Sequence, residues 1–146
     1  MNIIDGWSDP TPWTPPDRIA PAVQNILGDV HRLMRRIKRG PADHSDIWGA
    51  GFEYDCQGRV AAAMGTLSMA GFPLSCMRGY TGGAYLGRSK ISAKWQSHAV
   101  LGVCIHAAPK PVIYVLDDQQ EGVRTLHWMQ TNALYKSMSP RMRMEP

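Results

Sequence analysis

Cysteine is scarce in this chain, and long apolar runs are absent. Three cysteines in 146 residues are too few for a disulfide scaffold, and the odd number leaves at least one thiol free or paired with another molecule. No run approaches the roughly 18 apolar residues of a membrane-spanning helix. The first residues, MNIIDGWSDPTPW, contain neither a basic segment nor an apolar core. We therefore expect no membrane span and no signal peptide.

Charge is also limited, at 19% of residues, whereas hydrophobic residues make up 44%. This composition excludes a disordered tail and a coiled coil. Sixteen Lys and Arg against twelve Asp and Glu give a net charge of +4. This excess of positive charge is compatible with a polyanionic partner, such as nucleic acid, an anionic membrane or a cell-wall polymer, but it is too small to indicate which one.

The patterns that are present predict one α+β domain over residues 1–146. Four prolines make residues 1–17 an extended arm, and we expect Trp7 and Trp13 within it to pack onto the body. Apolar periodicity predicts the remaining elements. These are helices over 18–39, 56–70 and 121–137, strands over 98–105 and 112–118, a long polar loop or short hairpin over 78–97, and a frayed tail.

The feature that most indicates chemistry is the pair Asp55-Cys56 at the start of the predicted helix 56–70. Asp is a preferred N-cap residue, which would place Cys56 in the first helical turn. Unpaired backbone N–H groups and the helix dipole stabilise a thiolate there, and the same N–H groups can bind an oxyanion. Gly58 would keep this turn open to a substrate. The alternative is an ordinary half-buried cysteine beside a cap.

A nucleophilic cysteine needs a base, and the base needs an acceptor that orients it. His98 begins the predicted strand 98–105, and Asp117 and Asp118 end the next strand. In an antiparallel hairpin with Ile105 opposite Val112, His98 and Asp117 share one face and Asp118 points away.

We therefore prefer Asp117 as the third residue. A slip of one residue would select Asp118 instead. Gln119 and His106 are two further candidates for this role.

Two stretches resemble a known family. Residues 48–60, WGAGFEYDCQGRV, followed by AGFPL at 70–74, are similar to the signature of NlpC-type cell-wall peptidases, although Gln57 stands where the family has Ser. HAVLGV at 98–103 resembles the family's second motif. The resemblance implies a papain-like fold, with helices on a small antiparallel sheet and the nucleophilic Cys at a helix N-terminus. It also implies a triad of Cys56, His98 and a polar residue that hydrolyses amide bonds in peptidoglycan stem peptides.

The same resemblance suggests further site residues and partners. We expect Trp48, Tyr54, Gly58 and Trp95 to contact the substrate. Members without a signal peptide include type VI secretion amidase effectors, phage tail lysins and endolysins. The expected partners are therefore peptidoglycan and an immunity protein or a secretion or phage-tail delivery component. The expected place of action is the periplasm or cell wall after delivery.

No cofactor or metal is expected. Cys76, Cys104, His106 and His127 form a candidate zinc set, but they lack the C-x-x-C and H-x-x-x-H spacings of zinc sites. The sequence leaves open whether Cys76 and Cys104 form a disulfide.

Two other functions are compatible with the sequence. One is a papain-like cysteine protease or acyl-transfer toxin that acts on a protein target. The other is a small basic nucleic-acid-binding phage or regulatory protein that uses HRLMRRIKRG, residues 31–40, on phosphates. No helix-turn-helix spacing and no interleaving of aromatic and basic residues supports the second, so we do not expect nucleic acid as a partner.

Overall fold

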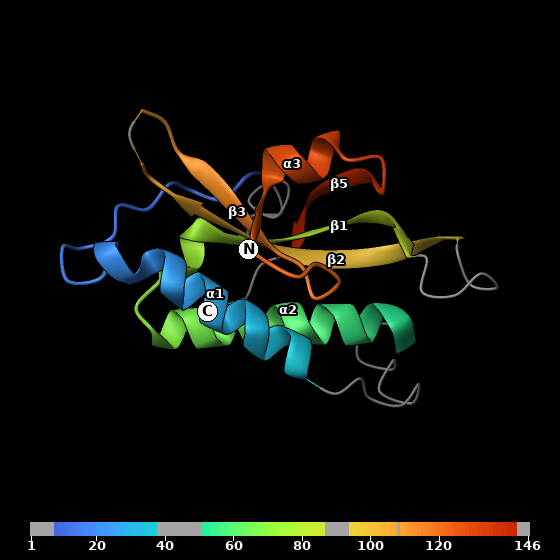
Figure 1. Ribbon diagram of the computed structural model, residues 1–146, viewed down its shortest axis with the longest axis horizontal. Helices are drawn as coiled ribbons and strands as arrows, with labels where there is room; N and C mark the ends of the chain where they lie inside the picture. The colour runs from blue at the N-terminus through green and yellow to red at the C-terminus, as the bar shows by residue number, and fades with distance from the viewer. Residues whose placement is uncertain (1–7, 38–50, 87–93, 108, 143–146) are drawn as a thin grey trace.

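The protein folds as an antiparallel sheet with helices on both faces. The computed structural model describes residues 8–37, 51–86, 94–107 and 109–142, and only the backbone of 51–55, 86, 94, 96 and 142. Helices α1 (Val23–Arg36) and α2 (Gly51–Met69) cover one face of the sheet, and α3 (Leu126–Thr131) lies on the other (Figure 1). This arrangement confirms the predicted α+β class.

The sheet has five strands in the order β4-β3-β2-β1-β5, and all neighbouring pairs are antiparallel. The strands are β1 (Met77–Leu86), β2 (Lys94–Ile105), β3 (Val112–Leu116), β4 (Arg124–Thr125) and β5 (Tyr135–Met142). Strands β2 and β3 pair from Ile105 opposite Val112 to Leu101 opposite Leu116. The register predicted for this hairpin is therefore confirmed.

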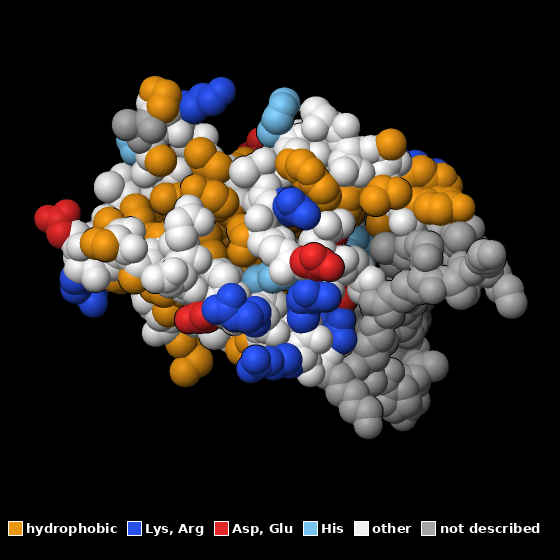
Figure 2. Space-filling view, in the orientation of Figure 1, with side chains coloured by type: hydrophobic (Ala, Val, Ile, Leu, Met, Phe, Trp, Pro, Cys, Tyr) orange, Lys and Arg blue, Asp and Glu red, His pale blue; other side chains and the backbone are white. Residues whose placement is uncertain are grey.

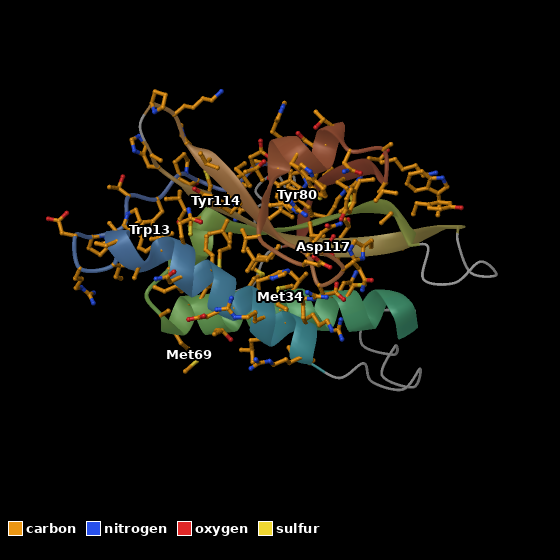
Figure 3. All side chains as sticks on the ribbon, in the orientation of Figure 1. Trp13, Met34, Met69, Tyr80, Tyr114 and Asp117 are labelled. Carbon is orange, nitrogen blue, oxygen red and sulfur yellow. The ribbon has the colours of Figure 1, made fainter. Side chains whose placement is uncertain are left out.

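Helix α1 forms where the sequence predicts it, with slightly shorter ends. Its buried side chains recur every three or four residues, as one face of an amphipathic helix requires. Pro21 lies in a 3-10 turn, Ala20–Ala22, that leads into the helix. In Figure 3, Met34 lies between the helices and the sheet, whereas Met69 at the end of α2 is 92% exposed and points away from the body.

The proline-rich arm lies against the body in an extended conformation. Trp13 forms an isolated bridge with Ile105, and its ring packs on Phe72 with centroids 4.7 Å apart. The backbone N–H of Thr11 donates to the carbonyl of Ser75. Trp7 lies outside the described residues.

Two predictions about secondary structure need correction. Of the two alternatives for residues 78–97, the loop is wrong and the hairpin is right, but the paired strands β1 and β2 are long, with Leu86 opposite Lys94. In place of the predicted helix, the stretch 121–137 contains β4, the short helix α3 and the start of β5, and residues 139–142 of the predicted frayed tail belong to β5. In both places strand pairing overrides local propensity, because the glycines of β1 and the Ser, Pro and Arg of β5 are weak strand signals. Only the pairing of β1 with β5 joins segments that are distant in sequence.

The exposed face of α1 carries charges of both signs. Arg32, Arg35 and Arg36 are exposed, and Arg32 forms an ion pair with Asp29. Figure 2 shows basic side chains gathered over the helical layer with acidic side chains beside them. This mixture is typical of a solvated helix face. In the described part of the chain, no helix is long and apolar enough to cross a bilayer.

The close contact of β1 with β5 yields a stability prediction. A Cβ on Gly82 would lie 2.7–2.8 Å from three backbone atoms of residues 136–138, and backbone cannot rotate away. We expect Gly82→Ala to lower the free energy of unfolding by roughly 1–3 kcal/mol, measured by urea denaturation.

Gly65→Ala on α2 is the matched control, because its Cβ would meet nothing within 4 Å. It should raise stability by up to about 1 kcal/mol through helix propensity. A Gly82→Ala variant as stable as the wild type would contradict the described β1–β5 packing.

Candidate active site

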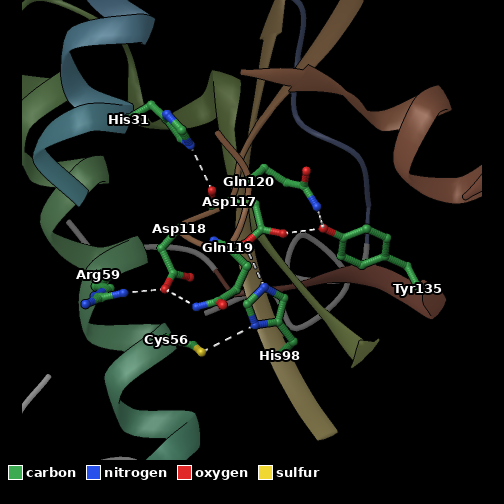
Figure 4. Close-up of polar contacts among 9 residues, drawn as sticks. All are labelled: His31, Cys56, Arg59, His98, Asp117, Asp118, Gln119, Gln120 and Tyr135. Carbon is green, nitrogen blue, oxygen red and sulfur yellow. Dashed lines mark hydrogen bonds and ion pairs between the residues drawn. The ribbon is translucent and has the colours of Figure 1, made fainter. Parts of the chain in front are cut away.

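Three elements bring a cysteine, a histidine and an aspartate into one hydrogen-bonded chain. Cys56 lies on α2, His98 on β2, and Asp117 directly follows β3. Sγ of Cys56 is 3.4 Å from Nδ1 of His98, and Nε2 of His98 is 2.7 Å from Oδ1 of Asp117 (Figure 4). Each ring nitrogen of His98 therefore faces one of the other two side chains. The three residues that the sequence selects lie together.

The three side chains are almost fully buried, at 1–2% exposure. Burial alone lowers the pKa of His98. The negative charge of Asp117, its hydrogen bond and the contact with Cys56 outweigh burial and raise that pKa from 6.5 to about 10. Burial raises the pKa of Asp117, but the His98 charge and the hydrogen bonds from His98, Tyr135 and Gln119 lower it overall. The geometry therefore favours a charged imidazolium–carboxylate pair.

Asp117 is fixed by donors from four directions. Besides His98, the backbone N–H of Gln119 donates to Oδ1 at 2.9 Å, and the hydroxyl of Tyr135 donates to Oδ2 at 2.5 Å. The backbone carbonyl of Asp117 is 2.8 Å from Nε2 of the buried His31. Tyr135 in turn accepts a hydrogen bond of 2.8 Å from the side chain of Gln120. These contacts restrict the carboxylate to one orientation toward His98.

Asp118 faces a different partner. Its Oδ2 forms a buried ion pair with Arg59 of α2 and accepts a hydrogen bond of 2.7 Å from the side chain of Gln119. Arg59 also donates to the carbonyl of Ile37 at the end of α1. The positive charge of Arg59 neutralises Asp118. His98 therefore pairs with Asp117 rather than with Asp118. This explains physically why Asp117, and not Asp118, contacts the histidine.

The predicted position of Cys56 in its helix is wrong. Helix α2 begins at Gly51, so Asp55 lies inside it and Cys56 is about one turn beyond its start. Only the first four N–H groups of a helix lack a partner within it. The N-cap preference of Asp is worth about 1 kcal/mol, and residues 52–54 include no helix breaker, so the helix extends past it. The helix start is therefore not the oxyanion site.

A cavity of about 720 Å³ opens beside His98. The residue that follows Cys56, Gln57, also lines it, and the Gln57 Oε1 atom is buried without a hydrogen-bond partner among the described residues. The remaining lining residues come from β1, β2 and β5: Thr81, Gly82, Gly83, Trp95, Ser97, Ala99, Lys136, Ser137 and Arg141.

The residues predicted to contact a substrate lie at different places relative to the cavity. Trp95 is 41% exposed and lines the cavity. Gly58 has open space where a Cβ would lie, but it does not line the cavity. Trp48 lies outside the described residues, and of Tyr54 only the backbone is described. His106, a candidate for the third residue, is exposed and follows the opposite end of β2 from His98.

Tyr135 and His31 belong to the site although the sequence does not predict a role for them. Tyr135 falls in a predicted helix, and nothing local marks it as a partner of Asp117. His31 has one available signal, since it lies four residues after Leu27 and three before Met34, on the buried face of α1. A histidine on an apolar face needs a hydrogen-bond partner, and here that partner is Asp117.

The remaining two cysteines are buried free thiols rather than a disulfide. Burial, together with the neighbouring Cys104, raises the pKa of Cys76 to about 12, and burial also raises that of Cys104. The candidate zinc set that contains both cysteines does not gather in the described part of the chain. The one group of potential metal ligands found there is Cys56, His98 and Asp118, with ligand atoms within 4.8 Å of one another. Asp118 forms an ion pair with Arg59, so its carboxylate already has a positively charged partner.

Comparisons with known proteins identify no relative of this chain. No protein-family model matches the chain, and neither a curated protein nor a solved structure matches it.

The buried pair of His98 and Asp117 should make stability depend on pH. Because the pKa of His98 is raised from 6.5 to about 10, the pair stabilises the fold fully below pH 6.5 and loses this contribution as pH rises toward 10. The lowered pKa of Asp117 adds stability above its ordinary value of 3.8, which is lost as pH falls below that value. Asp117→Asn should therefore cost most, roughly 3 kcal/mol, between about pH 4 and 6.5, and less near about pH 9.

Urea unfolding at several pH values measures this difference. Tyr135→Phe is the matched control, because it removes one hydrogen bond to Asp117 but leaves the charged pair intact, so it should keep the wild-type pH dependence. A penalty for Asp117→Asn that is equal at acidic and alkaline pH would argue against a charged pair.

Proposed function

We propose that this protein is a papain-like cysteine hydrolase that cleaves amide bonds. Cys56 is the nucleophile, His98 the general acid and base, and Asp117 the acceptor that orients His98. The observation that carries the proposal is the continuous chain from Sγ through the two ring nitrogens to a carboxylate oxygen. Nucleophilic catalysis by cysteine needs this arrangement, because the thiol must lose its proton to an oriented base.

The charged state of His98 fits this role. With its pKa raised, the imidazole holds a proton at neutral pH. In the proposed mechanism the nucleophile is the thiolate form of Cys56, whose sulfur faces this imidazolium. The thiolate attacks the carbonyl carbon of the substrate, and a C–S bond forms. The C–N bond then breaks, and the proton of His98 Nδ1 passes to the leaving amine. Water, deprotonated by His98, attacks the thioester, and the acid product leaves with the thiolate and imidazolium restored.

Gln57 is the residue best placed to bind the oxyanion. It follows Cys56 in the chain and lines the cavity beside His98. A side-chain amide supplies N–H donors of the kind that stabilise a tetrahedral intermediate. Gln57 and His98 both open onto the cavity although Cys56 is itself buried, so the substrate carbonyl approaches the thiol from there.

For the substrate we propose amide bonds in peptidoglycan stem peptides. The support is the resemblance of residues 48–60 and 98–103 to the motifs of NlpC-type peptidases, together with a cavity large enough for part of a peptide. The net charge of +4 is compatible with an anionic wall polymer. In this proposal the protein acts in the periplasm or cell wall after delivery. A delivery component and an immunity protein would then be its protein partners.

Thiol reactivity tests the identity of the nucleophile. Iodoacetamide at neutral pH should alkylate Cys56 before Cys76 and Cys104, because burial keeps the latter two protonated and only Cys56 faces an imidazolium. Peptide mapping by mass spectrometry measures the order.

His98→Ala is the control for this experiment, and it should slow the alkylation of Cys56 without accelerating that of Cys76 or Cys104. If Cys76 or Cys104 reacts first in the wild type, the assignment of Cys56 is wrong.

Digestion of purified peptidoglycan tests the reaction. The wild type should release fragments whose masses identify a cleaved amide bond. Cys56→Ala should release none, His98→Ala should be slower by several orders of magnitude, and Gln57→Leu should be slower by roughly 10²–10³-fold. His127→Ala and His106→Ala are matched controls, because both histidines are exposed and neither lines the cavity.

The cell compartment in which the protein is toxic distinguishes three possible targets: peptidoglycan, a protein and nucleic acid. Exported to the periplasm of a Gram-negative cell, the wild type should cause lysis, and Cys56→Ala should not. Toxicity in the cytoplasm without lysis on export would exclude peptidoglycan and favour a protein target. Salt-dependent DNA binding that survives Cys56→Ala would favour a nucleic-acid-binding protein.

A further inference from the structure

Three side chains of the site form a second arrangement, which differs from the hydrogen-bonded chain. Sγ of Cys56, a ring nitrogen of His98 and a carboxylate oxygen of Asp118 all lie within 4.8 Å of one another, and the three residues are buried. Figure 4 shows them converging from α2, from β2 and from the end of β3. The proposed mechanism uses the first two side chains but gives Asp118 no part, so the convergence of all three needs a separate explanation.

The donor atoms and their spacing fit one zinc ion. Thiolate, imidazole and carboxylate are the ligand types that Zn²⁺ takes in proteins, and bonds of about 2.3 Å to sulfur and about 2.0 Å to nitrogen at a tetrahedral angle place those two atoms about 3.5 Å apart. Sγ of Cys56 and Nδ1 of His98 are 3.4 Å apart. A shift of the Asp118 side chain by about 1 Å would bring its oxygen into the same shell. His98 also lines the cavity, so an ion reaches the donors from there.

The surrounding hydrogen bonds are those that support metal ligands. A histidine that binds a metal through one ring nitrogen usually donates its other N–H to a carboxylate. Nε2 of His98 lies 2.7 Å from Oδ1 of Asp117, which leaves Nδ1 for the ion. Arg59 and Gln119 both donate to Oδ2 of Asp118. An ionised carboxylate offers about four acceptor sites, so coordination of a metal is compatible with these two bonds.

The charges of the buried group balance when Zn²⁺ is present. Coordination requires a thiolate and a neutral imidazole, so the protons of the Cys56 thiol and of His98 Nδ1 leave to solvent. Cys56, Asp117 and Asp118 then carry three negative charges. Zn²⁺ and Arg59 supply three positive charges. The group has no net charge and avoids the cost of an uncompensated buried ion. Mg²⁺ and Ca²⁺ prefer shells made of oxygen, so sulfur and nitrogen donors select against them.

We propose that Cys56, His98 and Asp118 form a Zn²⁺-binding site, and that zinc bound there inhibits the enzyme reversibly. The inhibition rests on the proposed hydrolase function, whereas the binding of zinc does not. A zinc-bound sulfur no longer attacks the carbonyl carbon of a substrate. A zinc-bound Nδ1 no longer carries the proton that the leaving amine needs. Removal of the ion by a chelator returns both groups to their catalytic state.

The absorption spectrum with Co²⁺ tests binding without any substrate. Co²⁺ replaces Zn²⁺ in tetrahedral sites, and a thiolate ligand gives it a sulfur-to-metal charge-transfer band. The reduced full-length wild type should develop this band with one equivalent of Co²⁺. Zn²⁺ should abolish it, because Zn²⁺ binds more tightly than Co²⁺, and excess Mg²⁺ should not. Cys56→Ala should lack the band. Cys76→Ala and Cys104→Ala are the matched controls and should keep it, because neither thiol belongs to the donor group.

Substitution of Asp118 tests the third ligand. Asp118→Asn keeps an acceptor oxygen for Arg59, and Asp118→Asn with Arg59→Met removes the ion pair entirely, so neither variant buries an unpaired carboxylate. In both, the dissociation constant for Zn²⁺, measured by competition with a chromophoric chelator, should rise at least about tenfold. Arg59→Met alone is the control and should bind Zn²⁺ at least as tightly as the wild type. Wild-type affinity in both Asp118 variants, or a Co²⁺ band that survives in Cys56→Ala, would overturn the proposed site.

Peptidoglycan digestion tests the inhibition and separates it from the proposed function. Zn²⁺ at a concentration that saturates the site should stop the release of fragments, and excess EDTA should restore it. Full activity of the zinc-saturated enzyme, or activity that EDTA abolishes and Zn²⁺ restores, would overturn the inhibitory role. If no fragments appear with or without EDTA, the proposed hydrolysis fails, and the Co²⁺ spectrum and the Zn²⁺ affinities alone decide whether the site binds metal.

Discussion

Two consecutive carboxylates, Asp117 and Asp118, enter the interior at the end of β3, and each requires a positive partner. An unpaired buried charge costs several kcal/mol, so the surrounding elements must supply these partners. His98 of β2 faces Asp117, and Arg59 of α2 faces Asp118. Arg59 and Cys56 are three residues apart and so lie on one face of α2. The ion pair that neutralises Asp118 therefore also turns α2 so that Cys56 faces His98.

The site gathers elements that are distant in sequence. His31 of α1 contacts the backbone of Asp117, and Tyr135 of β5 contacts its side chain. Arg59 joins the same region to the end of α1 through the carbonyl of Ile37. A catalytic interpretation accounts for this convergence, because an orienting carboxylate must itself be held still. The same contacts satisfy the hydrogen-bonding requirements of buried polar groups, so the stability of the fold and the geometry of the site depend on the same atoms.

His98 and Asp117 could be placed together from the sequence because local patterns determine the hairpin between β2 and β3, whereas Cys56 was selected by a position at a helix start that the structure does not have. The apolar runs after His98 and before Asp117 identify both strands, and the turn between them sets Ile105 opposite Val112. The start of α2 could not be located, because a cap preference of about 1 kcal/mol is weaker than the other forces on a helix. Strand β5 was not predicted because it pairs with β1, a glycine-containing strand that is distant in sequence. No local sequence pattern at Tyr135 or Lys136 indicates this pairing.

The position of β5 at the end of the described chain has a consequence for synthesis. A nascent chain that has left the ribosome up to Asp118 contains Cys56, His98 and Asp117, but it lacks Tyr135 and the strand that pairs with β1. Until β5 emerges, β1 is an unpaired sheet edge with open N–H and C=O groups, which other chains can join. Ribosomes that stall or terminate early in this region would therefore release chains prone to associate through β1, with Asp117 deprived of the Tyr135 hydroxyl.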